Sequence, residues 1–454
     1  MNRLSFKNKI GYGSAALGDA AVYTFTGTFL IFFFTTVAGI NPALAGTITA
    51  IGAIFNALLN PVIGYITDNI MTKWGKRRPL MFLMAFPLLA STFLLFTAID
   101  IIPTIKPLYY AAILIIFWTS YTGYFVPYLA LGAEYTDDYD ERTSLRSYAS
   151  FFNMLGTLIA MVVPTALVEV LESAGLSTKA AWSATGFAVG LVSAASIFIT
   201  VACSKKKDVV INEEIGKKLN LNLKAIFKEY LELLTLKPMR SLLLVSLFFL
   251  ISYIMFVSDL VYFVTYNFGM SGGEVSVAML VRSLAGIIII PLINFVAIKS
   301  DKRKAFFIFM AFVCIVILAF RIFGIETELM LYVFIFITVT ATGTYWQLIP
   351  AMYYDICEYD RSVTGKMRQG SIVSFQGLTE AVASALGAQL LGLILQFAGF
   401  DGSAAVQTDS AILWIENTIT IIPVIFMAFS MVAMSRYDIT KESFKELKDE
   451  IHGK

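Results

Sequence analysis

The chain has 454 residues, of which 58% are hydrophobic and 15% charged, and its mean hydropathy is +0.76. Soluble domains carry about 25% charged residues, so this composition excludes an ordinary soluble enzyme. The 34 Lys and Arg residues nearly balance the 32 Asp and Glu residues, which excludes a strongly basic nucleic-acid-binding protein. One histidine, His452, and three scattered cysteines are too few for a metal site, a disulfide framework or histidine-dependent catalysis. We therefore expect a multi-pass membrane protein that is not an enzyme and holds no cofactor or metal.

Apolar segments long enough to cross a bilayer recur along the whole chain, and short polar loops separate them. A transmembrane helix needs about 20 apolar residues, whereas a strand of an outer-membrane barrel needs only about 10. The lengths predict twelve membrane-spanning helices, at residues 14–37, 43–66, 80–98, 108–133, 150–170, 181–203, 242–268, 275–297, 305–323, 329–354, 373–397 and 411–434.

The basic residues of the loops set the expected orientation. The N-terminal stretch, every second loop and the C-terminal tail together hold 30 of the 34 Lys and Arg residues. The loops on the other side hold three, which are Lys106, Lys179 and Arg321. Because basic residues stay on the cytoplasmic side, we expect both termini in the cytoplasm and the protein in the cytoplasmic membrane.

The longest loop divides the predicted spans into two sets of six. We expect an N-terminal six-helix bundle at residues 1–203, a cytoplasmic linker at 204–241, a C-terminal six-helix bundle at 242–434 and a cytoplasmic tail at 435–454. Within the linker, apolar residues recur at helical spacing, which predicts a short amphipathic helix that lies on the membrane surface or packs under the bundle. These residues are Ile226, Phe227, Tyr230, Leu231 and Leu234.

The two halves also contain similar sequences. Residues 139–144 after the fourth span resemble residues 359–364 after the tenth, an offset of 220 positions. The basic loop at 68–78 has a counterpart at 299–304. Two six-helix repeats form the all-α major facilitator fold, in which the substrate site lies near the middle of the membrane. We therefore expect this fold.

Four ionisable residues lie deep within predicted spans, where such groups are costly and usually functional. Asp19 is either a functional group or a structural hydrogen-bond partner. Asp259 and Arg282 lie on neighbouring spans and either pair with each other or act in transport. Glu380 is either a coupling group or an interhelical polar contact. Glu416 lies close enough to the end of its span for us to expect it to be solvated.

Aromatic residues with polar tips gather in the fourth, seventh and tenth spans. They are Tyr121, Tyr124, Tyr128, Tyr262, Tyr266, Tyr345, Trp346 and Tyr353. An aromatic ring with a polar edge suits a hydroxylated ring such as a sugar, although packing or an interface position explains most single tyrosines equally well. Trp346, with Gln347 beside it, is the clearest candidate for a substrate contact.

Several short motifs resemble those of one transporter family. They are Tyr12-Gly13 and Gly18-Asp19, Asn60-Pro61 with Gly64 and Asp68, Trp74 to Pro79, Pro127-Tyr128, Asp138-Tyr139 with Glu141 to Thr143, Asp355 to Tyr359, and Thr364 to Lys366 with Arg368 and Gly370 to Ile372. These stretches resemble the glycoside–pentoside–hexuronide:cation symporters, the melibiose-permease family within the major facilitator fold. The resemblance covers nearly the whole chain.

The resemblance implies coupled uptake of a sugar or glycoside. It gives the acid of the first span, Asp19, a role in binding sugar hydroxyls, and it implies that Trp346, nine residues before Asp355, stacks near the sugar. It also implies that the Tyr121-Thr122 pair brings a threonine oxygen near the coupling cation.

The chain departs from the family at several functional positions. The two sodium-ligating acids of the second span are Asn56 and Asn60 here, and the acid of the fourth span is Phe125. The tryptophan that follows in the family is Leu129, and the arginine of the fifth span falls at Ala149 or Ser150. The galactoside site is therefore not carried over intact, and melibiose itself is a poor candidate.

We interpret the sequence as a secondary transporter that imports a sugar or glycoside by alternating access, with a proton favoured over sodium as the coupling ion. The expected substrate-binding residues are Asp19, Tyr121, Tyr128, Trp346 and Gln347. The expected position of a cation site is formed by Asn56, Asn60 and Thr122. The coupling candidates are Asp19, Asp259 and Glu380. A substrate with a carboxylate, such as a hexuronide, could use Arg282.

Three alternatives remain open: an uncoupled sugar facilitator, a carrier of an amphiphile such as a lysolipid, and a sugar sensor that does not transport. The sequence Gly269–Gly273 matches the G-x-S-x-G motif of hydrolases. However, no strand is expected before it, and no histidine is available as the base of a catalytic triad. The expected partners are a small sugar or glycoside and the lipid bilayer, with no nucleic acid and no obligate protein partner.

Overall fold

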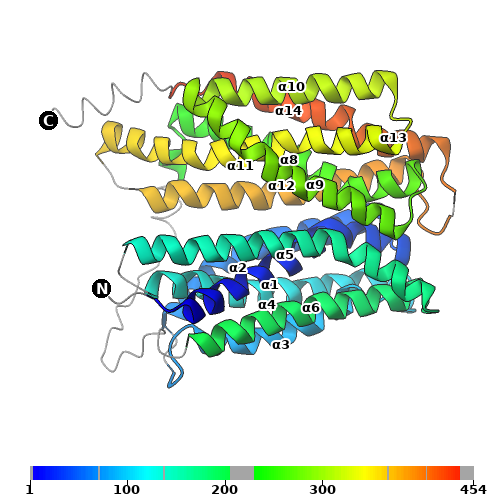
Figure 1. The fold of residues 1–454 in the computed structure, drawn as a ribbon, viewed down its shortest axis with the longest axis horizontal. Helices are drawn as coiled ribbons and strands as arrows, with labels where there is room; N and C mark the ends of the chain where they lie inside the picture. Colours follow the sequence, from blue (N-terminus) through cyan, green and yellow to red (C-terminus); the bar gives the residue numbers. More distant parts are fainter. Residues whose placement is uncertain are drawn as a thin grey trace. The chain divides into compact units, whose positions relative to one another are not determined.

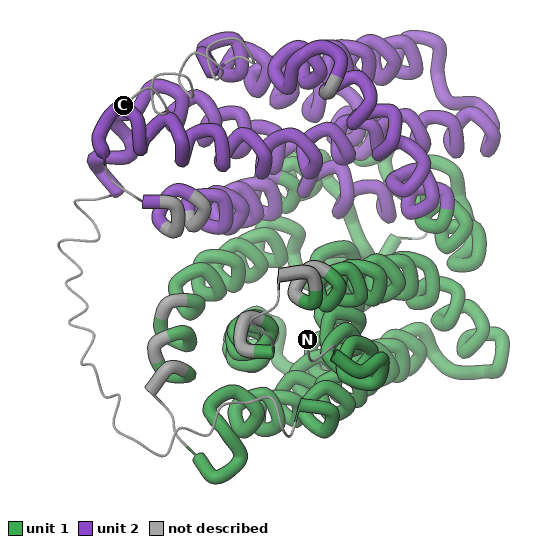
Figure 2. The backbone as a smooth tube through the Cα atoms, turned by 60° about the vertical axis from the view of Figure 1, so that its left-hand side comes forward, with its two compact units in different colours: residues 1–218, 264–280, 391–412 green, residues 219–263, 281–390, 413–454 purple. Residues whose placement is uncertain are grey.

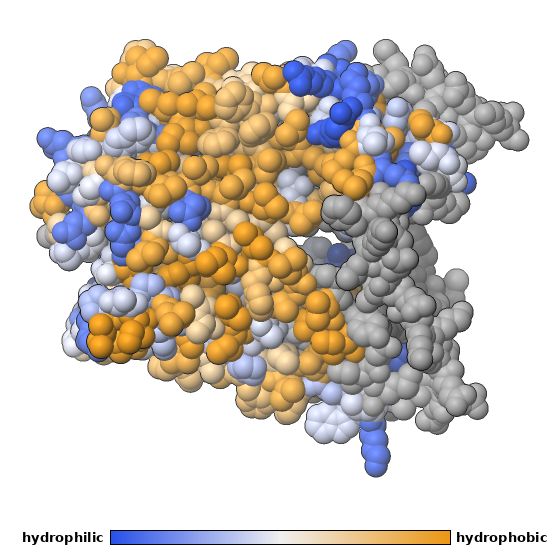
Figure 3. Space-filling model, turned by 180° about the vertical axis from the view of Figure 1, so that it is seen from behind, coloured by the Kyte–Doolittle hydropathy of each residue, from blue (hydrophilic) through white to orange (hydrophobic). Residues whose placement is uncertain are grey.

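The computed structural model of the chain is helical (Figure 1). It describes residues 4–69, 72–135, 139–204, 230–365, 368–404 and 406–439, and these contain helices, turns and no β-strand. Twelve helices in this part of the chain are long and apolar enough to cross a membrane. Apolar side chains form a broad area on the face drawn in Figure 3. The predicted all-α membrane protein with twelve spans is confirmed.

The helices follow one another with short connections. In the first half they are α1 (Phe6–Phe32) with the π-helix η1 (Phe33–Val37), α2 (Pro42–Asn69), α3 (Arg78–Leu95), α4 (Lys106–Glu134), α5 (Tyr139–Ser173) and α6 (Thr178–Cys203). In the second half they are α8 (Lys237–Tyr262) with the π-helix η2 (Phe263–Asn267), α9 (Gly272–Lys299), α10 (Lys302–Phe323), α11 (Glu328–Thr364), α12 (Gln369–Phe397), α13 (Asp409–Ile419) and α14 (Ile421–Ser435).

Two helices extend well beyond the spans expected from hydropathy. Helix α5 begins at Tyr139 instead of residue 150, and α11 ends at Thr364 instead of residue 354. The added turns contain charged residues, which lower the hydropathy of the segment without preventing a helix. Helix α11 stops where Gly365 takes the left-handed conformation, with φ +69°. Hydropathy thus located the membrane-embedded part of each helix and missed its polar end.

The chain divides into two compact units (Figure 2). Unit 1 contains residues 1–218, 264–280 and 391–412, and unit 2 contains residues 219–263, 281–390 and 413–454. Two segments of the second half, around the start of α9 and the end of α12, thus belong to unit 1. The domain boundaries expected from the sequence stay a prediction.

The two halves repeat each other with an offset of 230 residues. Helices α2 and α9 both have 28 residues, and the π-helices η1 and η2 both have five. Each π-helix is followed by a glycine with positive φ, Gly39 at +68° and Gly269 at +64°. After each, an amide bonds back to the π-helix, from Ile40 to Phe34 and from Met270 to Val264.

This register corrects the similarity seen in the sequence at an offset of 220. Tyr139 begins α5, whereas Tyr359 lies inside α11, which continues to Thr364. The structural counterpart of Tyr139 is Gln369, which begins α12. The two similar sequences therefore occupy different places in their repeats.

Unit 1 is organised around α1, which packs against α5 and α6. Glycines bring these helices together: a side chain at Gly18 would collide with the backbone of Ser193, and one at Gly156 would collide with the carbonyl of Leu17. The Thr200 hydroxyl donates to the Gly11 carbonyl at 2.6 Å, which adds a polar contact between α1 and α6. These contacts fix the position of α1, on which Asp19 lies.

The linker expected to form an amphipathic helix lies largely outside the described residues, which resume at Tyr230. The ring of Tyr230 packs on Phe375 of α12, with centroids 4.6 Å apart, and Leu233 is fully buried. This end of the linker therefore packs within unit 2, while Ile226 and Phe227 are not described.

Candidate functional site

A hydrogen-bonded carboxylate lies in the middle of unit 1. Asp19 of α1 is 8% exposed, and the hydroxyl of Tyr121 on α4 donates to its Oδ1 at 2.7 Å. The amide of Asn153 on α5 donates to Oδ2 over a longer distance of 3.5 Å. Three helices thus converge on one acidic group. The short bond to Tyr121 has the geometry of a charge-assisted hydrogen bond.

Aromatic rings surround the Tyr121 partner of this carboxylate. Phe125 stacks on Tyr121 with centroids 5.4 Å apart, and Trp118 meets it edge-on at 5.5 Å. Tyr23 of α1 lies 5.6 Å from the Tyr121 ring and remains 48% exposed. Phe125 occupies the position where the related family has an acid, so aromatic packing replaces a charge here.

The open side of α1 lies directly beside Asp19. From Gly11 to Ile31 the helix is almost wholly buried, and its exposed residues are Tyr23 and Gly27. These residues follow Asp19 at intervals of four, so the three share one helix face. A ligand that approaches this face meets a carboxylate, a phenol ring and a glycine that leaves room.

Tyr128 does not join this group in the structure. Its ring stacks on Tyr12 with centroids 4.7 Å apart, and it is 2% exposed. Tyr128 therefore lies in the packed interior between α1 and α4. Its expected role in substrate binding stays a prediction.

The expected cation-site residues lie together on α2 and α4. The Thr122 hydroxyl donates to Oδ1 of Asn56 at 2.6 Å, and the Asn60 amide donates to the Asn56 backbone carbonyl at 2.9 Å. The side-chain carbonyl of Asn56, the oxygen that a cation would need, already accepts a hydrogen bond. These three residues contribute amides and a hydroxyl but no charge.

In unit 2 an aromatic stack supports Trp346. Tyr345 is fully buried and stacks on Phe249 of α8, with centroids 4.6 Å apart and planes at 10°. Trp346 meets Tyr345 edge-on at 5.3 Å and is 41% exposed. Gln347 beside it is partly exposed. A fixed, accessible indole with a neighbouring amide is suited to stacking on a ring with hydroxyl groups.

Asp259 and Arg282 do not pair with each other. The Asp259 side chain is fully buried in α8, and neither carboxyl oxygen has a hydrogen-bond partner among the described residues. The guanidinium of Arg282 lies over the rings of Tyr253 and Phe256, at 5.8 and 5.7 Å. Aromatic rings therefore contact this cation, and the alternative in which it pairs with Asp259 is not realised.

The two remaining acids have different surroundings. Glu380 on α12 is partly exposed and accepts a hydrogen bond from Gln376 at 3.0 Å. Glu416 pairs with Arg321 at 3.2 Å, and both side chains are about a quarter exposed, at 25% and 27%. The expected solvation of Glu416 is thus only partial, because an arginine on α10 approaches it.

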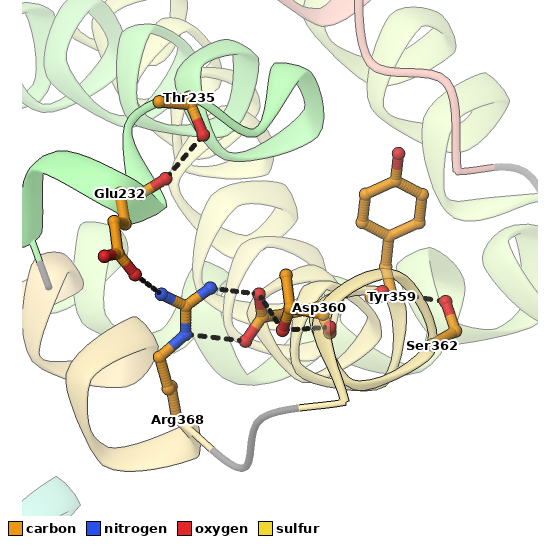
Figure 4. Close-up of polar contacts among 7 residues, drawn as sticks. Glu232, Thr235, Tyr359, Asp360, Ser362 and Arg368 are labelled. Atoms are coloured by element: carbon orange, nitrogen blue, oxygen red, sulfur yellow. Dashed lines mark hydrogen bonds and ion pairs between the residues drawn. The ribbon is translucent and has the colours of Figure 1, made fainter.

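An ion-pair cluster joins the ends of α11 and α12 (Figure 4). Arg368 lies between two acids, with its Nε 3.0 Å from Asp360 Oδ2 and its Nη1 3.0 Å from Glu232. Asp360 is fully buried, and Thr364 donates to its Oδ1 at 3.2 Å. Arg368 lies in a motif shared with the related family, but the sequence did not show that it pairs with Asp360.

Sequence reasoning missed two residues beside Asp19, which are Tyr23 and Asn153. The spacing of four residues between Asp19 and Tyr23 was a usable signal, since it places both on one face of a helix. Asn153 lies in α5, 134 positions from Asp19, and no local pattern connects the two.

Comparison with known proteins supports a transport function. The sequence profile of the family described as MFS/sugar transport protein matches residues 11–441. The symporter YnaJ of Bacillus subtilis is 27% identical over 462 residues, covering 100% of this chain and 96% of the relative. The isoprimeverose transporter of Lactiplantibacillus pentosus is 22% identical, covering 99% of this chain and 92% of the relative.

A solved structure shows the same fold. The bacterial homologue of the lysosomal transporter Spinster, in an inward-facing state, aligns with a TM-score of 0.69 at 14% identity, over 95% of this chain and 97% of its own. Together with the family match, this likeness confirms the expected major facilitator fold. The family match and the full-length relatives also agree with the prediction of a transporter that is not an enzyme. The expected orientation of the termini stays a prediction.

Proposed function

Because the chain belongs to the MFS/sugar transport protein family, among the glycoside–pentoside–hexuronide:cation symporters, we propose that it imports a sugar or glycoside across the cell membrane together with a proton. Relatives over the full length include an isoprimeverose transporter and a glucuronide carrier homologue. These names support a glycoside as the class of substrate.

The observation that carries the proposal is the hydrogen bond of 2.7 Å between Tyr121 and Asp19, on the open face of α1. A carboxylate accepts hydrogen bonds from sugar hydroxyls, and the exposed ring of Tyr23 offers an apolar face beside it. In unit 2, Trp346 and Gln347 repeat this combination of ring and polar group. Sugars have hydroxyl edges and apolar faces, so they match both features.

A proton is favoured over sodium because the cation-site position holds no acid. Sodium prefers hard oxygen ligands, and a partly dehydrated cation in a membrane needs nearby negative charge. Asn56 and Asn60 supply only amides, and the side-chain carbonyl of Asn56 already accepts a bond from Thr122. An amide also cannot exchange a proton at physiological pH.

Transport assays separate this function from its alternatives. The protein is reconstituted in vesicles, and uptake of labelled sugars from a panel of monosaccharides, glycosides and hexuronides is measured with and without an inward proton gradient. Accumulation driven by the gradient is the expected result. Equilibration without accumulation indicates a facilitator, and binding without flux indicates a sensor. Transport of a lysolipid and of none of the sugars contradicts the proposal.

A further inference from the structure

Helix α2 is exposed on two opposite faces. One face carries the apolar side chains of Leu58 and Val62, which are 66% and 51% exposed and suit contact with lipid. Asn60 is also exposed, and it lies two residues from both of them, which is about 200° around the helix. We call the side with Asn56, Asn60 and Gly64, which recur at intervals of four residues, the inner face of α2.

The inner face of α2 carries two amides with open space beside them. The Thr122 hydroxyl of α4 donates to Oδ1 of Asn56 at 2.6 Å, so this face is turned toward α4. The Asn60 amide donates to the Asn56 backbone carbonyl at 2.9 Å. Gly64 is partly exposed, and a side chain there would meet only Val126, at 3.9 Å. A ligand therefore has room beside Asn60.

This face lies at the same level of α4 as the carboxylate of Asp19. Tyr121 donates to Asp19 at 2.7 Å, and the next residue, Thr122, donates to Asn56 at 2.6 Å. Two consecutive residues of α4 thus hold an acidic group on α1 and an amide on α2. All of these residues belong to unit 1.

The hydrogen-bonding groups that remain on the two amides are mainly donors. An asparagine side chain has two N–H donors and one carbonyl oxygen. The Asn56 oxygen is occupied by Thr122, and among the described residues no hydrogen bond uses its two N–H groups. Asn60 uses one N–H, which leaves the other N–H and its oxygen. A hard cation is bound by oxygen acceptors, so this set of groups is poorly suited to one.

A sugar suits this combination because each hydroxyl group both donates and accepts. Its O–H donates to a carboxylate such as Asp19, which only accepts. The lone pairs of a hydroxyl oxygen accept from amide N–H groups such as those of Asn56 and Asn60. A cation has no lone pair to offer to these donors.

We propose that Asn56 and Asn60 donate hydrogen bonds to hydroxyl oxygens of the transported sugar and form one binding site with Asp19. This inference rests on the proposed sugar transport. The position where the related family binds its cation is then part of the sugar site in this chain. Thr122 positions the Asn56 amide and does not ligate an ion.

The test is a thermodynamic cycle between a side chain and a sugar hydroxyl. Methyl glycosides of glucose, galactose, xylose and glucuronic acid are titrated into the purified full-length protein by calorimetry. The probe that binds most tightly is then replaced by each of its monodeoxy derivatives. If vesicle uptake identifies a transported sugar outside these four, that sugar is the probe.

Loss of one neutral hydrogen bond should raise the Kd of the probe about 2- to 12-fold in Asn60→Ala and in Asn56→Ala. For each variant, one monodeoxy derivative should bind the parent protein more weakly than the full sugar does. The same derivative should bind the variant as tightly as the full sugar does, because the partner of the missing hydroxyl is already gone.

Two further variants and one salt control complete the experiment. Asn60→Leu keeps the volume of the side chain and removes its polar groups, so it should behave as Asn60→Ala does. Leu58→Ala changes the opposite, apolar face of the same turn and should bind every probe as the parent protein does. Replacing potassium by sodium in the buffer should leave the Kd of the probe unchanged.

Three results overturn the inference. The first is an unchanged Kd in both Asn56→Ala and Asn60→Ala. The second is a cycle in which every monodeoxy derivative loses the same factor in the variants as in the parent protein. The third is a sodium-dependent Kd that becomes independent of sodium in Asn56→Ala, which assigns the position to a cation. If the parent protein binds none of the probes and transports no sugar, the proposed function itself fails, which is a different outcome.

Discussion

Replacing Asp19 or its partner Tyr121 tests the proposed sugar site most directly. Asp19→Asn keeps the size of the side chain and removes its charge. Tyr121→Phe keeps the ring, with its contacts to Phe125 and Tyr23, and removes the hydroxyl that donates to Asp19 at 2.7 Å. Each variant therefore alters hydrogen bonding and leaves the shape of the site nearly unchanged.

The expected magnitude follows from the kind of bond that is lost. A hydrogen bond to a charged group contributes about 1.5–3 kcal/mol. If a sugar hydroxyl bonds to Asp19, Asp19→Asn should raise the Kd about 10- to 150-fold, since about 1.4 kcal/mol corresponds to a factor of ten. Tyr121→Phe should have a smaller effect. The Asp19 carboxylate remains as the acceptor for the sugar and loses only the hydrogen bond that orients it. The double variant should be less than additive, since the two residues act through one contact.

The assay is titration calorimetry on the purified protein, after a thermal-shift screen of mono-, di- and oligosaccharides and hexuronides has identified a ligand. Tyr109→Phe, in the first turn of α4, is a matched control that should bind normally. The reasoning is refuted if Asp19→Asn and Tyr121→Phe both bind the ligand as tightly as the parent protein.

Four further outcomes are expected. Trp346→Ala should weaken sugar binding by about 1 kcal/mol through loss of the ring contact, and unchanged calorimetry contradicts its role. Uptake should be indifferent to sodium, and sodium-stimulated accumulation that is abolished by Asn56→Ala or Asn60→Ala shows that neutral ligands suffice. Asp360→Asn should lower the free energy of unfolding by about 3 kcal/mol, because it leaves a buried guanidinium with a single acid, and an unchanged denaturation midpoint argues against this. Residues 204–241 should resist protease added outside sealed cells, and cleavage there contradicts the expected cytoplasmic location of this loop.

Much of the fold could be predicted from the sequence because membrane insertion requires a visible signal. Each span must supply about 20 apolar residues, so all twelve helices were recognisable from composition alone. The polar extensions of α5 and α11 were missed, since hydropathy does not report helices outside the bilayer. The repeat register was also missed: residues 139–144 and 359–364 are similar in sequence, yet the helices themselves repeat at an offset of 230.

The candidate site was less predictable, because its partners come from different helices. Asp19 stood out as a charge within an apolar span, but its bond to Tyr121 joins residues 102 positions apart. Charge alone left two alternatives for Asp259 and Arg282, a mutual pair or a role in transport. The structure does not form the pair, because the Arg282 side chain lies against the rings of Tyr253 and Phe256, an arrangement that depends on packing.

The repeat register also relates Asp19 of unit 1 to a residue of unit 2. At the offset of 230 residues, Asp19 of α1 corresponds to Phe249 of α8. In unit 1 this position supplies a carboxylate that bonds to a tyrosine of α4, and in unit 2 it supplies a ring that stacks on Tyr345 and so supports Trp346. Equivalent positions of the two repeats thus have an acidic side chain in one and an aromatic side chain in the other. Each kind of contact matches one feature of a sugar, because its hydroxyl edges suit a carboxylate and its apolar ring faces suit an aromatic ring.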